Sequence, residues 1–153
     1  MFKKVLIAGI AIVLLGVGYY LLSPLFINIK VDEADPAPKP QEAEVKSAEI
    51  IGTTAHPASG SVRVVDDGSN TYIRYENFKT INGPDIYVYL AKDLEAKEFV
   101  SLGRVRATEG NVNYETPAGT EVTDYKYVMI WCKAFGVLFN YADISNLITR
   151  PRI

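Results

Sequence analysis

The sequence predicts an all-β domain, an antiparallel β-sandwich or barrel-like fold of about seven to eight strands, preceded by one transmembrane helix. Short runs of strand-forming residues recur after residue 46, and turn signals such as Asp67-Gly68 separate them. Residues 5–22, by contrast, carry no charge. We therefore expect five parts: a cytoplasmic N-terminus (1–4), a transmembrane signal-anchor helix (5–23), a proline-rich acidic linker (24–46), an extracytoplasmic β domain (47–148) and a tail (149–153).

The uncharged segment at the N-terminus predicts a membrane anchor. A helix over 5–22 would be about 27 Å long, close to the thickness of a bilayer core. Lys3 and Lys4 precede it, which predicts a single-pass cell-membrane protein with its N-terminus inside and its C-terminal domain outside. A cleaved signal peptide would have an apolar region of about 7–15 residues and a small-x-small site. No convincing site follows Leu22, so the uncleaved anchor is favoured and the lipid bilayer is the expected partner of 5–23.

The segment between the anchor and the domain is rich in proline and charge. Residues 32–44 contain three prolines and no aromatic residue. Such a composition cannot bury enough apolar surface to fold, and proline keeps the chain extended. The sequence therefore predicts a plain spacer that holds the domain away from the membrane.

Alternating residues and turn signals place the strands of the domain. The predicted strands before the last pair are 61–67, 71–78, 86–91 and 99–105. Residues 82–85 and 109–113 read as turns, because they are rich in glycine, asparagine and aspartate. The pattern over 45–54 fits either a short strand or a turn of helix.

The stretch 125–142 is the centre of the predicted domain. Alternation divides its first strand into two faces, with Val128, Ile130 and Cys132 on one and Tyr127, Met129 and Trp131 on the other. Both faces are apolar or aromatic, so we expect a central strand covered on both sides. A tight reversal near Gly136 leads into an antiparallel neighbour.

Composition excludes several classes of function. The chain has one cysteine and one histidine, which excludes an intrachain disulfide, a multi-cysteine zinc or iron–sulfur site and a histidine-rich metal site. Its net charge of −2 gives no electrostatic footprint for nucleic acid. We find no Ser/His/Asp arrangement, catalytic carboxylate pair or phosphate-binding loop in the sequence.

Four motifs follow one another through the domain. They are His56-Pro57-Ala58-Ser59-Gly60, the GPDIYVYL run at 83–90, the GNVNYETP run at 110–117 and the WCKAFGVLF run at 131–139. In this order they resemble the DM-thirteen family, which is catalogued as an electron-transfer domain and also occurs in the insect cuticle proteins Skeletor and Knickkopf. The resemblance covers about 51–142. It implies an all-β extracytoplasmic domain with a characteristic cysteine for which a redox role has been proposed.

Cys132 is the first candidate site residue, and it has two interpretations. A reactive thiol needs exposure and a lowered pKa, and Lys133 could supply positive charge beside it. A free cysteine is also among the residues most often buried in a core. His56 could act as a second ligand or as a base for the thiolate, or simply bond to the backbone of its loop. Together they could hold a haem or a copper ion, although the sequence identifies no metal.

The remaining motif residues are expected to be structural. They are Gly83, Pro84, Asp85, Gly110, Trp131, Phe135 and Phe139. We expect the glycines to supply positive φ, and Asp85 either to cap backbone N–H groups or to bind a cation with Asp66 or Asp67.

Two functions of different classes remain open from the sequence. The first is a membrane-anchored domain with a redox or electron-transfer role centred on Cys132, working with a redox partner protein. The second is a non-enzymatic binding or adhesion module, for a protein or a surface polymer, in which the cysteine is buried. A stand-alone enzyme is not expected.

Overall fold

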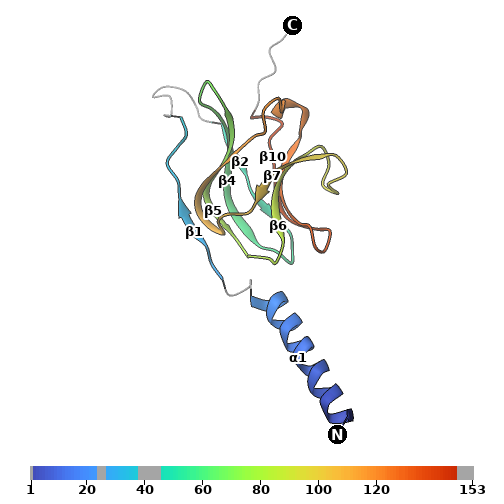
Figure 1. The fold of residues 1–153 in the computed structure, drawn as a ribbon. Coiled ribbons are helices and arrows are strands. Elements are labelled where there is room, and N and C mark those ends of the chain that lie inside the picture. The colour runs from blue at the N-terminus through green and yellow to red at the C-terminus, as the bar shows by residue number, and fades with distance from the viewer. Residues whose placement is uncertain (1, 24–26, 38–45, 148–153) are drawn as a thin grey trace.

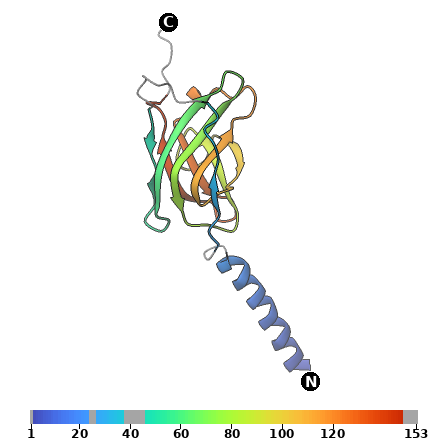
Figure 2. The same cartoon turned by 90° about the vertical axis from the view of Figure 1, so that its left-hand side faces the viewer.

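The computed structural model describes residues 2–23, 27–37 and 46–147. Two five-stranded sheets pack face to face, and one helix extends from an end of the sandwich (Figures 1 and 2). The elements are α1 (Phe2–Leu22), β1 (Lys30–Asp32), β2 (Ala48–Glu49), β3 (Ile51–Gly52), β4 (Ala58–Asp66), β5 (Thr71–Thr80), β6 (Ile86–Ala91), β7 (Phe99–Arg104), β8 (Glu109–Glu115), a 3-10 turn (Val122–Asp124), β9 (Tyr127–Cys132) and β10 (Val137–Asp143). The predicted β-sandwich behind a helix is confirmed, and strands of two or three residues at the sheet edges account for the larger strand number.

The two sheets have different strand orders. One runs β1-β8-β5-β4-β2 and the other runs β3-β10-β9-β6-β7. All pairings are antiparallel except that of β1 with β8. The central strand predicted at 127–132 is β9, which lies between β10 and β6.

The two faces of β9 pack as the alternation predicts. Val128, Ile130 and Cys132 belong to the main core between the sheets. The opposite face carries Met129, which is fully buried in a second, smaller cluster that includes four tyrosines and Trp131 on the outside of that sheet. A slip by one residue would exchange the faces and bring Tyr127, Met129 and Trp131 into the space that Val128, Ile130 and Cys132 fill, so the difference in side-chain size opposes such a slip.

The turn predicted at 109–113 is wrong, since these residues begin strand β8. Val112 and Tyr114 alternate inward and are buried, which is the strand pattern. Gly110 and the asparagines suggested a turn, but Gly110 has a φ of +113° within the strand. A Cβ on Gly110 would lie 1.9 Å from the Val31 carbonyl oxygen, so a larger residue would displace β1.

Residues 27–37 also depart from the predicted linker, because they lie on the domain as a strap. Val31 pairs in parallel with Gly110, and Lys30 and Asp32 pair with the residues on either side. The strap therefore adds an edge strand to the first sheet instead of separating the domain from the helix. Residues 24–26 and 38–45 of the predicted linker lie outside the described residues. The same holds for residue 148 and the predicted tail at 149–153.

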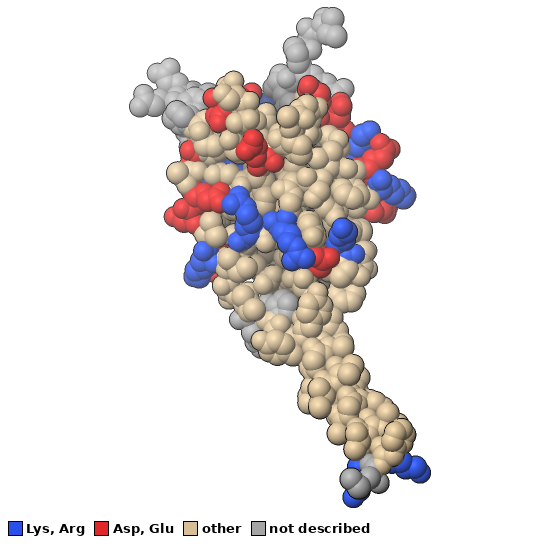
Figure 3. Space-filling view, viewed as in Figure 1, with Lys and Arg blue, Asp and Glu red and all other residues tan. Residues whose placement is uncertain are grey.

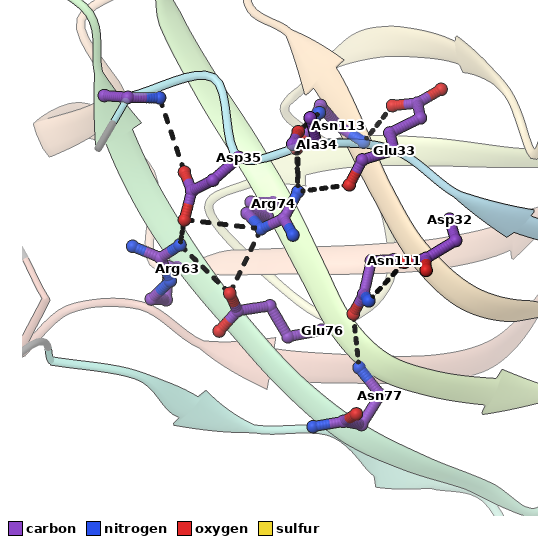
Figure 4. A network of polar contacts seen from close by, with 11 residues as sticks. Asp32, Glu33, Ala34, Asp35, Arg63, Arg74, Glu76, Asn77, Asn111 and Asn113 are labelled. Carbon is purple, nitrogen blue, oxygen red and sulfur yellow. Dashed lines mark hydrogen bonds and ion pairs between the residues drawn. The ribbon is translucent and has the colours of Figure 1, made fainter. Parts of the chain in front are cut away.

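A polar network holds the strap on the sheet (Figure 4). Arg74 donates through Nη1 to the carbonyl oxygens of Glu33 and Ala34, at 3.2 and 3.1 Å, and through Nε to Glu76 at 3.1 Å. Asp35 accepts from Arg63, which also donates to Glu76 at 3.0 Å. Both arginine side chains are almost fully buried, so each carboxylate compensates a charge that would otherwise be costly to desolvate.

Helix α1 is long and apolar enough to cross a membrane, and none of its residues is buried against the domain. Beyond Lys4 the helix is uncharged and has no polar face that would mark one side as facing water. In Figure 3 the basic side chains of the helix lie at the end far from the domain.

Candidate functional site: a pocket beside the helix

A pocket of about 340 Å³ opens at the end of the sandwich nearest the helix. Its wall brings together residues from three of the four sequence motifs: His56, Gly83, Pro84, Phe135 and Phe139. The other lining residues are Leu21, Ala55, Ile81, Asn82 and Val137. The loops before β4 and β6 and the β9–β10 hairpin meet at this end, which is why residues far apart in the sequence converge there.

His56 is held in place by a short loop. Its backbone N–H donates to the Thr53 carbonyl at 3.0 Å, and its Nδ1 lies 2.9 Å from Thr53 Oγ1. The imidazole stacks on the Phe139 ring, with centroids 3.9 Å apart and planes 17° from parallel. Burial lowers the pKa of His56 from its ordinary value, which favours the neutral ring at pH 7.

The 82–84 segment forms another part of the wall. Asn82 accepts the Gly83 N–H through Oδ1 at 2.8 Å and donates through Nδ2 to the Ile27 carbonyl at 3.2 Å. A Cβ on Gly83 would lie 2.8 Å from Ile86 Cγ2 and 2.9 Å from Phe139 Cζ. Space therefore explains this glycine, whereas the expected positive φ is found at Gly110 and not here.

Asp85 has a different partner from either of the two expected. Its carboxylate pairs with Arg104 at 2.5 Å, and its backbone carbonyl accepts the Lys133 N–H. Asp66 and Asp67 accept N–H groups of their own turn, at Gly68, Ser69 and Asn70. These three carboxylates therefore stabilise turns and an ion pair in the structure.

The β9–β10 hairpin carries an exposed aromatic side chain to the rim of the pocket. Phe135 is 59% exposed at the tip, and Gly136 beside it has a φ of +62° that suits a tight turn. Lys133 belongs to the same hairpin, and its Nζ lies 5.6 Å from the centroid of the Tyr87 ring on β6. The hairpin tip at the rim is therefore exposed and aromatic, and Arg104 lies over the same Tyr87 ring at 5.3 Å.

Cys132 lies in the core and not on the pocket surface. Its residue is 0% exposed, and its neighbours across the sheet are Ile86 and Val137. It is a free thiol. Among the contacts of the described residues, none is a hydrogen bond from this sulfur to His56, whose Nδ1 faces Thr53 instead.

A comparison of the sequence with known protein families identifies the family. The family model described as electron transfer DM13 matches residues 51–144, well over half of the chain. This chain belongs to the DM13 family. Among curated proteins and among solved structures, none matches it.

Because the family is described by electron transfer, we ask whether the residues of this chain could hold a redox cofactor. Within the described ranges, no three residues of the histidine, cysteine, aspartate and glutamate types are grouped to hold a metal ion. A haem or copper bound through Cys132 and His56 would need the sulfur to be accessible, yet the core encloses it completely. The pair therefore does not fit such a group in this arrangement.

Sequence reasoning missed several residues of the DM13 pocket. Asn82 and Val137 line it, and Leu21 contributes from the helix. Asn82 could have been found from its place directly before the GPD run, of which Gly83 and Pro84 line the pocket. Val137 lies inside the WCKAFGVLF motif, whereas Leu21 carries no signal beyond being apolar, because only the fold brings it to the pocket.

Proposed function

We propose that this DM13 protein is a membrane-anchored, extracytoplasmic binding domain that holds a small, largely apolar ligand in the pocket beside His56. Cys132 is then a core residue. One observation carries the proposal: residues of three separate motifs converge on the pocket, while the thiol is sealed in the core. Small-molecule sites are typically concave and apolar with a few polar groups, and this pocket lies at the low end of their usual volume range of about 300–1,000 Å³.

The orientation in the membrane follows from the ends of α1. Lys3 and Lys4 lie in the first turn of the helix and the domain follows its other end, which supports a position of the domain outside under the positive-inside rule. The helix is the part that lies in the lipid bilayer.

The family description favours a second candidate, a redox role centred on Cys132. It would require local opening of the core, because the thiolate must be reached by its reaction partner. A role for His56 as a base on this thiol would require the same opening, because Cys132 is enclosed in the core while His56 lies in the pocket wall. Reactivity of the thiol in the folded protein distinguishes the two candidates.

The experiment for the binding function uses the full chain in detergent micelles. A panel of single-ring aromatic compounds is screened by saturation-transfer NMR. We expect several compounds to bind, and Val137→Trp to abolish their binding by filling the pocket. The matched control is Val100→Trp on the edge strand β7, which lies outside the pocket and should leave binding unchanged. Binding that survives Val137→Trp in a folded variant, or a panel without a single hit, would contradict the function.

A further inference from the structure

The chain itself ties the pocket to the membrane surface. Ser23 directly follows α1, and the Ile27 carbonyl accepts the hydrogen bond from Asn82 in the pocket wall. Four residue steps separate Ser23 from Ile27, so their Cα atoms lie at most about 14 Å apart however the helix is tilted. If α1 spans a bilayer, the pocket must therefore lie at the outer surface of that bilayer.

The surface around the pocket suits such a position. Phe135, Val137 and Ile27 are exposed apolar residues at this end, at 59%, 38% and 50%. Figure 3 shows the charged side chains of the domain over its middle and far end, while the part next to the helix is largely uncharged on this face. Exposed apolar side chains such as these can enter the boundary between lipid headgroups and acyl chains.

The interior of the pocket selects a particular ligand chemistry. Asn82 uses both ends of its amide within the protein, on Gly83 and Ile27. His56 presents a flat ring on Phe139, and when Thr53 donates to Nδ1 the neutral imidazole can donate from Nε2. The walls thus provide an aromatic stack and, in that tautomer, an imidazole N–H donor beside apolar side chains.

We propose that the pocket binds the ring of a membrane-soluble quinone, which enters from the bilayer, with a ring carbonyl accepting from His56 Nε2 and the isoprenoid tail remaining in lipid. The inference rests on the proposed binding function and names its ligand class and source. A planar ring matches the stacked pair of His56 and Phe139, and a ring carbonyl matches a neutral N–H donor. A volume of about 340 Å³ holds one ring and not a complete lipid.

The test uses the full chain in nanodiscs of phosphatidylethanolamine and phosphatidylglycerol. Because the chain has one histidine, ¹⁵N-histidine labelling reports on His56 alone. We expect a ubiquinone with a two-isoprenoid tail to move the Nε2 signal saturably. The matching isoprenoid alcohol, which lacks the ring, should leave the signal in place. An equal shift with the alcohol, or no shift with the ubiquinone, would overturn the inference.

Two further changes test the source of the ligand. Inserting about twenty glycine and serine residues after Ser23 lets the domain move about 25 Å from the helix. We expect this to weaken ubiquinone binding in nanodiscs by at least about 10-fold, because the pocket loses its high local ligand concentration. Phe135→Ala at the rim should also weaken binding, whereas Phe99→Ala, an exposed phenylalanine on β7 outside the pocket, should not.

The outcomes separate this inference from the function on which it rests. If the tail-free ubiquinone ring binds as tightly from water and the insertion changes nothing, the ligand comes from solvent and the membrane source is wrong. If no quinone binds, but other ring compounds bind the wild type and not the Val137→Trp variant, the ligand class is wrong and the binding function stands. If nothing binds in either experiment, both fail.

Discussion

Cys132 is the single cysteine of the chain and His56 is its single histidine, and both side chains are reactive. The fold places them in opposite environments. Cys132 lies on the inward phase of a central strand and is completely enclosed. His56 lies in a loop and forms part of the wall of an open pocket. The Phe139 ring belongs to both regions, since it packs in the core and stacks on the imidazole.

The difference shows that a rare residue in a motif can serve the fold as easily as the function. Its position decides which. A side chain at the inward phase of a strand between two neighbours is buried on folding, whatever its chemistry. A loop at the end of a sandwich remains accessible, so its side chains can meet a ligand.

The largest effect is expected at Phe139, the residue shared by the two regions. Phe139→Ala should lower the free energy of unfolding by about 3–5 kcal/mol, because it leaves a cavity in the core and removes the support of His56. Urea unfolding of the full chain in detergent measures it. Phe135→Ala, a control on an exposed phenylalanine, should cost about 1 kcal/mol or less. Similar costs for the two would mean that Phe139 is not a core residue.

Cys132→Ser comes next. In a buried site it should cost about 1–3 kcal/mol, because a hydroxyl without a partner replaces a nearly apolar thiol. The melting midpoint of the full chain reports the loss. Cys132→Ala, which introduces no polar group, should be the milder change. A serine variant as stable as the wild type would show that residue 132 is accessible to water.

His56→Ala should have a small effect on stability and a large one on binding. The loss of the Thr53 contact and of the stack on Phe139 should cost about 1 kcal/mol. Binding of ring compounds should be lost, as seen by saturation-transfer NMR. His56→Phe retains the stack but not the donor, so it should restore stability more than binding. Full binding by the alanine variant would place the ligand elsewhere.

The smallest effect concerns pH. Burial lowers the folded-state pKa of His56, so the unfolded chain binds the proton more readily. The stabilisation from the neutral ring is present above the unfolded pKa of about 6.5 and is lost as pH falls from there through the lower folded-state pKa. Melting midpoints of wild type and His56→Phe between pH 8 and 5 should diverge on the acid side. Parallel curves would show that the imidazole is no harder to protonate when folded.

The sequence predicts much of the core but little of the pocket. Alternation over 127–132 and 86–91 identifies the buried faces, because a sheet turns every second residue inward. The strap is missed, since Asp35 looks like linker charge until Arg63 and Arg74 are seen to face it. The pocket depends on loops that meet only in the fold.

Truncated forms of the protein should retain the strap at residues 27–37. A soluble chain that begins after residue 46 lacks β1 and leaves Arg63 without one of its carboxylate partners. The full chain in detergent is therefore the better sample for chemistry at Cys132.

The most direct test of the account is the reaction of Cys132 with a thiol reagent, in the full chain, native and unfolded, across pH. Since the chain has a single cysteine, the signal belongs to one residue. The account predicts one thiol reacting promptly after unfolding and almost none in the folded protein at any pH that preserves the fold. Rapid, stoichiometric reaction of the native protein would contradict it, and would make Cys132, not the pocket beside His56, the centre of function.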